Sequence, residues 1–199
     1  MIDLVRVPQL VGHCGPSSVA MLLGFQGVST TQEEIVKVAG ISQTVEEIGS
    51  RIDQLAYAIE KIEPSLTIMG KFNCTSIDID LVINSLKLPF GVEWQGIFED
   101  KELGQFEIGH YSVLNSFDPN TQNIGIVDPD DTSIYKDGII PKEVFFPRWW
   151  EVNIMKDEKK YRTDGLGFVI VGQELVEILQ KYGFSPVNYE FLMASSSSP

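Results

Sequence analysis

The feature that most constrains the fold is a change in patterning near the middle of the chain. Before residue 88 the apolar residues recur at helical spacing, and several segments begin with capping residues. After it, short segments rich in β-branched and aromatic residues are separated by turn sequences. Because helices come first and strands follow, the order predicts an α+β fold in which N-terminal helices pack on an antiparallel β-sheet.

Individual elements follow from the same patterns. The helices are expected at 16–25, 29–40, 44–62 and 75–88, and the strands at 88–95, 109–117, 123–128 and 166–172. The turn sequence at 118–123 predicts a hairpin between the second and third strands. A last helix is expected at 173–183, and the serine-rich end predicts a disordered tail over 191–199. With 199 residues, 43% of them hydrophobic, the chain predicts a single domain over 1–190.

Composition and charge argue against several classes of function. The formal charge of −13 opposes binding to nucleic acid or to an anionic membrane and favours a neutral or basic substrate. The sequence has neither an apolar run of about 18 residues nor a secretory signal, so a cytoplasmic protein is expected. The only histidines, His13 and His110, lie far apart, and no Cys/His cluster has zinc spacing, so no metal or cofactor is predicted.

Cys14 stands directly before "GPSSVAMLL", at the start of the first predicted helix. The N-terminus of a helix favours the thiolate form of a cysteine, which is the nucleophilic form. Nucleophilic catalysis also needs a base and a group that orients the base. His110 is the candidate base: it is expected to open a strand after Gly109, whose missing side chain would let a substrate approach closely.

Asp128 is the candidate group that orients His110. It ends the strand expected at 123–128, and hairpin pairing would bring it beside the start of the strand that carries His110. Acyl transfer also requires donors for the developing oxyanion. Gln9 is the candidate side-chain donor, and the backbone N–H of Cys14 is the second.

Each of these four residues also has a simpler interpretation. Cys14 and His110 are also compatible with a place in the core, where free cysteines and hydrogen-bonded histidines are common. Asp128 is also compatible with ordinary turn chemistry before a proline, and Gln9 with a solvated surface position.

Other conspicuous residues are interpreted as structural. Cys74 has no histidine near it in sequence, and His13 is interpreted as an exposed loop residue. Trp94, Trp149 and Trp150 either wall a substrate cleft or belong to the core, and their places near strand ends favour the core.

The chain resembles the C39-like peptidases of the papain-like cysteine peptidase superfamily in "VPQLVGHCGPSSVAMLLGFQG", "GHYSVLNSFDPNTQNIGIVDPD" and "FFPRWW". The resemblance runs in order from about residue 6 to residue 172. It implies a papain-like fold with Cys14 as nucleophile, His110 as base and acid, Asp128 as orienting residue and Gln9 in the oxyanion hole. His13 stands where exporter-fused members often carry Asp, and no exporter follows, so a double-glycine substrate is not implied.

The expected function is therefore a cysteine peptidase or amidase that hydrolyses a peptide or amide bond through a thioester, with a peptide or protein as substrate. Two alternatives stay open. A transglutaminase-like or other acyltransferase would use the same residues with an amine acceptor, and a non-catalytic module would use the fold for peptide binding.

Overall fold

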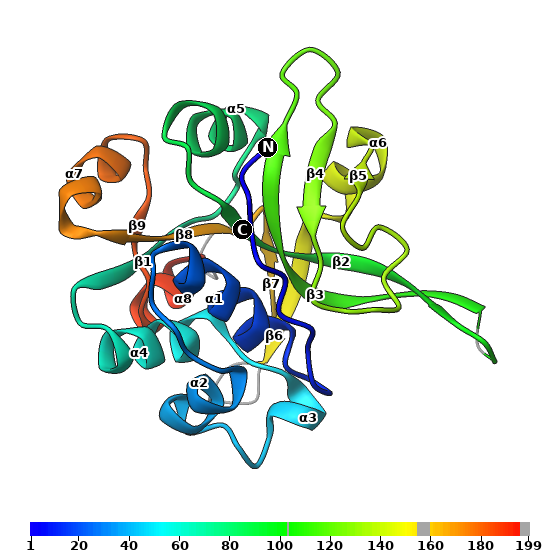
Figure 1. Ribbon diagram of the computed structural model, residues 1–199, viewed down its shortest axis with the longest axis horizontal. Helices are drawn as coiled ribbons and strands as arrows, with labels where there is room; N and C mark the ends of the chain where they lie inside the picture. The colour runs from blue at the N-terminus through cyan, green and yellow to red at the C-terminus, as the bar shows by residue number, and fades with distance from the viewer. Residues whose placement is uncertain (103, 155–159, 196–199) are drawn as a thin grey trace.

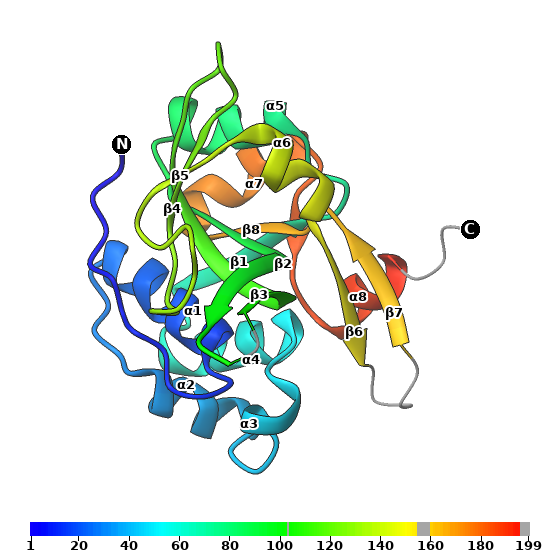
Figure 2. The ribbon, with the colours of Figure 1, turned by 90° about the vertical axis from the view of Figure 1, so that its right-hand side faces the viewer.

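The computed structural model describes residues 1–102, 104–154 and 160–195, and it consists of an antiparallel sheet with helices on both of its faces (Figure 1, Figure 2). The helical segments are α1 (Cys14–Phe25), α2 (Gln32–Ala39), α3 (Val45–Ile48), α4 (Ile52–Ile62), α5 (Ser76–Ile79), the π-helix η1 (Asp80–Ser85), α6 (Lys142–Phe145), the 3₁₀ helix η2 (Phe146–Arg148), α7 (Gln173–Lys181) and α8 (Tyr189–Ser195).

Seven strands form the main sheet in the order β5-β4-β3-β2-β8-β1-β9, and β6 and β7 form a separate two-stranded sheet. All neighbouring strands are antiparallel, which confirms the predicted α+β class. The strands are β1 (Leu66–Lys71), β2 (Phe90–Asp100), β3 (Gly104–Phe117), β4 (Ile124–Val127), β5 (Ile139–Ile140), β6 (Trp150–Ile154), β7 (Lys160–Asp164), β8 (Gly167–Gly172) and β9 (Ser185–Pro186).

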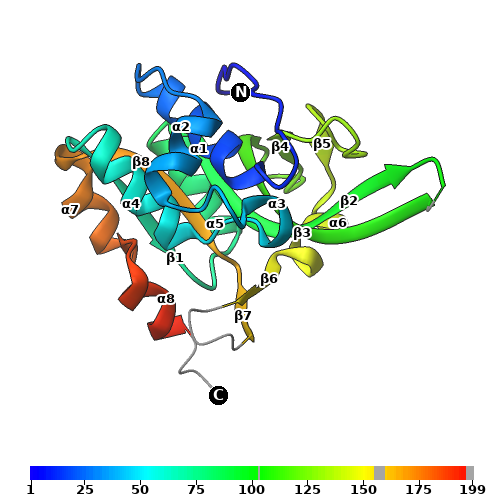
Figure 3. The ribbon, with the colours of Figure 1, turned by 90° about the horizontal axis from the view of Figure 1, so that it is seen from below.

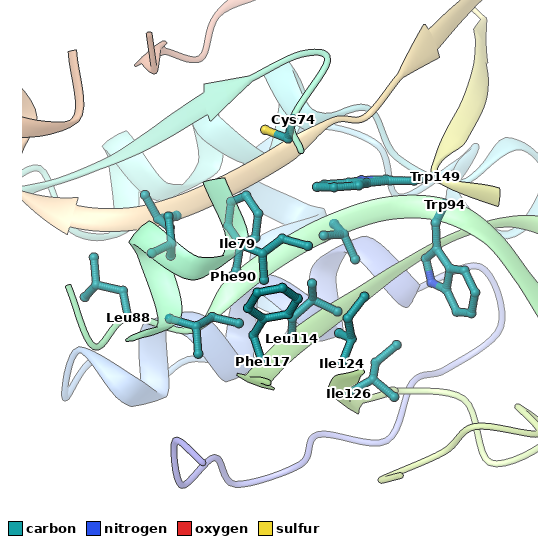
Figure 4. Packing of buried hydrophobic residues seen from close by; sticks show 14 of the residues in the cluster. Cys74, Ile79, Leu88, Phe90, Trp94, Leu114, Phe117, Ile124, Ile126 and Trp149 are labelled. Carbon is teal, nitrogen blue, oxygen red and sulfur yellow. The ribbon is translucent and has the colours of Figure 1, made fainter. Parts of the chain in front are cut away.

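Both faces of the main sheet are buried. In β8, Phe168 and Ile170 belong to one core, whereas Val169 and Val171 belong to the other, because successive residues of a strand point to opposite faces. The first core lies under α1, α2 and α4, and the second contains side chains of η1 and α7. Figure 4 shows part of the second core, including Trp94 and Trp149.

The prediction of one continuous helix over 44–62 is wrong, because α3 and α4 are separate helices. Gly49 between them has φ 69° and ψ −150°, a conformation outside the helical region that glycine adopts without a steric penalty. Ile48, which one continuous helix over 44–62 would place on the same face as Ile52 and Leu55, is exposed. The break gives the segment from α3 to α4 a bend, and this bend borders the cleft described below.

The strands β2 and β3 are longer than predicted and pair continuously from Phe90 with Leu114 to Asp100 with Gly104. Their outer part projects from the body of the molecule (Figure 1, Figure 3). His110 therefore lies within β3, so the expectation that it opens the strand is wrong. The strands β6 and β7 were not predicted, because only their pairing with each other, and not a local apolar pattern, identifies them.

The expectation of a disordered tail from residue 191 is wrong for residues 191–195, which belong to α8. Phe191 stacks on Phe72 with ring centroids 4.5 Å apart, and Leu192 is buried in the first core. Residues 196–199 lie outside the described part of the chain. Within the described ranges, no helix combines the length and the apolar character that crossing a bilayer requires.

Candidate active site

Cys14 is the first residue of α1, and its free thiol is half-buried. The helix is held firmly because every residue from Gly15 to Leu23 is buried, enclosed by the sheet on one side and by α2 and α4 on the other. The backbone N–H groups of Cys14 and Gly15 have no acceptor within the helix. The structure thus places the thiol at the positive end of a buried helix, as predicted.

His110 and Asp128 form a buried pair. His110 Nε2 lies 2.8 Å from Asp128 Oδ1, and the two side chains are 3% and 0% exposed. The ring of His110 packs edge-on against Phe98, with centroids 4.9 Å apart. Because Asp128 occupies Nε2, the ring nitrogen left for the thiol is Nδ1.

The hydroxyl of Ser112 and the indole of Trp94, which the sequence did not identify, hold Asp128 in place through hydrogen bonds. Ser112 Oγ donates to Asp128 Oδ2 at 2.9 Å, and Trp94 Nε1 donates to Ser112 Oγ at 3.0 Å. Ser112 lies on the same strand and the same face as His110, since the two are separated by one residue. The carboxylate therefore has a fixed orientation toward the imidazole ring.

The pKa of His110 is set by opposing effects. Burial favours the neutral ring, but the charge and hydrogen bond of Asp128, together with a hydrogen bond and charge interaction with Cys14, raise the pKa of His110 to about 10. Burial alone would raise the pKa of Asp128, yet the charge of His110 and the hydrogen bonds from His110, Asp130 and Ser112 lower it. The geometry therefore favours a charged His110–Asp128 pair in contact with Cys14.

Gln9 is held against the turn that follows β4. Its backbone N–H donates to Pro129 O at 2.9 Å, and its Nε2 donates to Asp130 Oδ2 at 2.7 Å. Arg6 Nε donates to Asp128 O at 2.6 Å and adds a second connection to this turn. The N-terminal segment is thereby fixed beside the residues that carry the buried pair.

A cleft of about 490 Å³ joins these groups, and Gln9, Cys14 and His110 all line it. The bend between α3 and α4 borders the cleft, as do β6 and the projecting parts of β2 and β3. Its lining carries the carboxylates of Glu46, Glu47, Glu93, Asp130 and Glu151. Arg51 also lines it, but its guanidinium is paired with Asp53 at 2.9 Å. Among the described residues, no group of three or more His, Cys, Asp or Glu side chains is arranged to hold a metal ion.

Gly109 leaves space for a protein group, so the expectation that it leaves space for a substrate is wrong. A Cβ atom at this position would overlap the carboxylate of Glu151. Gln95 Nε2 holds that carboxylate by a hydrogen bond to Oε2 of 2.9 Å. Burial raises the pKa of Glu151, while the charge of His110 acts in the opposite direction. Glu151 therefore belongs to the wall of the cleft next to His110, a role that its surface-like sequence context did not indicate.

Glu93 is a second carboxyl group in the cleft wall that the sequence did not identify. It is 3% exposed and faces Tyr111 across β2 and β3. Asn153 Nδ2 donates to Glu93 Oε2 at 3.1 Å, which connects β6 to the main sheet. Burial raises the pKa of Glu93 to about 7, although the hydrogen bond from Asn153 partly opposes this effect.

The remaining residues singled out in the sequence are structural. His13 is buried and its Nδ1 lies 2.7 Å from Val11 O, so the interpretation as an exposed loop residue is wrong. Cys74 is buried, its Sγ donates to Lys71 O at 3.3 Å, and burial raises the pKa of its thiol. Trp94 and Trp149 lie in the second core, and Trp150 stacks beneath the guanidinium of Arg162 at 4.3 Å.

A helix that begins with a cysteine and packs on an antiparallel sheet with a His–Asp pair is the architecture of the papain-like cysteine peptidases. Within this class, the chain belongs to the Peptidase_C39 like family, which matches residues 1–153. The matched region contains Gln9, Cys14, His110 and Asp128 and ends within β6.

Among solved structures, the chain is similar to the peptidase domain of Streptococcus ComA, described as a bifunctional ABC transporter involved in a quorum-sensing pathway. The two share 20% sequence identity with a TM-score of 0.56, and the match covers 87% of this chain and 100% of that one. At this identity the similarity shows the fold alone. A search of the curated proteins found no match.

Proposed function

We propose that the chain is a cysteine peptidase or amidase that hydrolyses peptide or other amide bonds. The observation that carries the proposal is that Cys14 and His110 line the same open cleft, where the ring of His110 is hydrogen-bonded to Asp128 at 2.8 Å. A nucleophile, a base and an orienting carboxylate in this order are the parts that acyl transfer through a thiol requires. Membership of the C39-like family supports the same reaction class.

In the first half of the reaction, the Cys14 thiolate attacks the carbonyl carbon of the scissile amide. The bond between sulfur and carbon forms, and negative charge develops on the carbonyl oxygen. We assign the stabilisation of this oxyanion to Gln9 Nε2 and the backbone N–H of Cys14. The carbon–nitrogen bond then breaks, and His110 gives its proton to the leaving amine.

In the second half, water replaces the amine. Neutral His110 takes a proton from water as the hydroxide oxygen adds to the thioester carbonyl. Collapse of this intermediate breaks the bond between sulfur and carbon, releases the carboxylic acid and restores the thiolate beside protonated His110. Asp128 remains ionised throughout and keeps the ring of His110 oriented.

The reaction needs a reduced thiol, and both cysteines of the chain are free. We therefore propose the cytoplasm, where thiols stay reduced, as the site of action. The excess of carboxylates in the cleft lining supports a neutral or basic peptide as substrate.

The test is hydrolysis of a peptide library prepared from a digested proteome, with new termini identified by mass spectrometry. The wild-type chain is expected to generate new termini, and Cys14→Ala, which removes the nucleophile, is expected to generate none. Cleavage that persists in Cys14→Ala, or the absence of cleavage by the wild type, would overturn the proposal. Repeating the reaction with an added primary amine separates hydrolysis from acyl transfer, because transfer yields the new amide in place of the acid.

A further inference from the structure

We infer that Asp130 positions the carboxamide of Gln9 so that its N–H₂ group, and not its oxygen, faces the reacting carbonyl. The inference rests on the proposed function and extends it to a residue outside the group formed by Cys14, His110 and Asp128. Asp130 acts through Gln9 and is therefore a positioning residue.

The contact that carries the inference is the hydrogen bond from Gln9 Nε2 to Asp130 Oδ2, at 2.7 Å. Gln9, Asp130 and Cys14 line the same cleft, so the carboxamide lies at the site where a substrate would bind. An ionised carboxylate accepts hydrogen bonds and cannot donate them. It therefore selects the rotamer of Gln9 in which the N–H₂ group points to Asp130 and excludes the rotamer turned by 180°.

This selection has a chemical consequence. The N–H₂ group has two hydrogens, and Asp130 uses one of them, which leaves the second for an oxyanion. Gln9 Oε1 is buried and makes no hydrogen bond among the described residues, so no contact of the oxygen there contributes to the choice of rotamer. Without the charge of Asp130, the carboxamide could present its oxygen to the negative charge that develops on the substrate.

Asp130 is itself rigidly held. Its Oδ1 accepts from the backbone N–H and the hydroxyl of Thr132, each at 2.7 Å. Its backbone N–H donates to Asp128 Oδ1 at 2.9 Å. The single turn from Asp128 to Asp130 therefore holds both the carboxylate that orients His110 and the carboxylate that orients Gln9. A single rigid segment thus sets the relative position of the base and the proposed oxyanion donor.

Asp130→Asn is the variant that tests the charge. It keeps the size of the side chain, the acceptor for Thr132 and the backbone N–H that donates to Asp128. Asp131→Asn is the matched control, since it makes the same charge change one residue later, on an exposed side chain that pairs with Arg6 and Lys136. The substrate is the peptide that the wild type cleaves fastest in the library described above.

We expect Asp130→Asn to lower kcat by about 10- to 100-fold with a smaller change in KM, because an oxyanion donor acts in the transition state. Gln9→Ala is expected to lower kcat by about 100-fold, and the double variant to be no slower than Gln9→Ala alone. Alkylation of Cys14 by iodoacetamide, which develops no oxyanion, is expected to keep its wild-type rate in Asp130→Asn. Unchanged or raised kcat in Asp130→Asn, additive losses in the double variant, or slowed alkylation would each overturn the inference.

The contact is also tested without turnover. In a ¹⁵N-labelled sample, the side-chain amide signals of Gln9 are identified by their loss in Gln9→Ala. They are expected to shift in Asp130→Asn and to stay unchanged in Asp131→Asn. If the wild type cleaves no peptide, the proposed function fails, and these signals alone decide the inference: unshifted signals in Asp130→Asn overturn it.

Discussion

Asp128 contacts His110 because the register of the β3–β4 hairpin places Asp128 opposite Ser112, two residues along β3 from His110. Val127 pairs with Val113, so the following residue, Asp128, comes beside Ser112. Ser112 and His110 point to the same face of β3, and both contact the carboxylate, at 2.9 and 2.8 Å. The pair thus depends on the strand register, including the irregularity between Leu114 and Ser116 that shifts the pairing by one residue and brings Asp128 opposite Ser112.

Asp128→Asn is expected to lower the pKa of His110 by about 1 to 3, because it removes the nearest negative charge. The raised pKa of His110 means that the protonated ring is present below that pKa and is lost as the pH rises through it. The upper pH limit of peptide hydrolysis is therefore expected to move to lower pH. NMR titration of the His110 ring measures the change directly, with Asp131→Asn as control. An unchanged titration of His110 would contradict the ion pair.

Ser112→Ala is expected to reduce the free energy of unfolding by about 1 to 3 kcal/mol, because it leaves the indole N–H of Trp94 buried without an acceptor. Denaturant unfolding measures this loss. Ser116→Ala on the same strand, where the side chain is only half-buried, is the control and is expected to stay within about 0.5 kcal/mol of wild type. Equal effects of the two substitutions would show that the contact between Trp94 and Ser112 does not contribute.

Glu93→Gln is expected to change how stability depends on pH. Burial raises the pKa of Glu93 from 4.5 to about 7, so the folded state binds more protons than the unfolded state between these values. The stability from this group is complete below about pH 4.5 and is lost as the pH rises through about 7, a loss of about 3 kcal/mol. Glutamine does not titrate and can still accept from Asn153.

Unfolding in denaturant at about pH 5 and about pH 8 tests this prediction. The wild type is expected to lose stability between the two values relative to Glu93→Gln. Glu99→Gln, a substitution of an exposed carboxylate on the same strand, is expected to keep the wild-type dependence. Parallel behaviour of wild type and Glu93→Gln would show that Glu93 does not titrate in this range.

Gly109→Ala is expected to displace the carboxylate of Glu151 and to break its hydrogen bond with Gln95, since the new Cβ atom would overlap it. We expect a loss of about 1 kcal/mol in the free energy of unfolding. In a Glu151→Ala background the same substitution is expected to have little effect, because the overlapping group is gone. A double-mutant cycle measured by denaturant unfolding tests this coupling. Additive effects would mean that the two positions do not meet.

Much of the fold followed from local signals in the sequence. Capping residues at its start predicted α2, and Thr31 Oγ1 accepts from the N–H of Glu34 in the structure. Apolar runs and turn sequences predicted β4 and β8. Local signals failed where a backbone conformation ends a helix. At Gly49 the positive φ interrupts the apolar pattern that would join α3 and α4 into one helix.

The sequence by itself determined which residues could do the chemistry: Cys14 at a helix start, His110 on a strand, and Asp128 at the end of the next strand. These relations are short-range along the chain, so capping, periodicity and hairpin pairing indicate them. Only the tertiary structure decided what surrounds these residues. Gln9 meets Asp130 across 121 residues, and Asn153 meets Glu93 across 60. Such contacts depend on how separate elements pack, and no local pattern records the packing that brings them together.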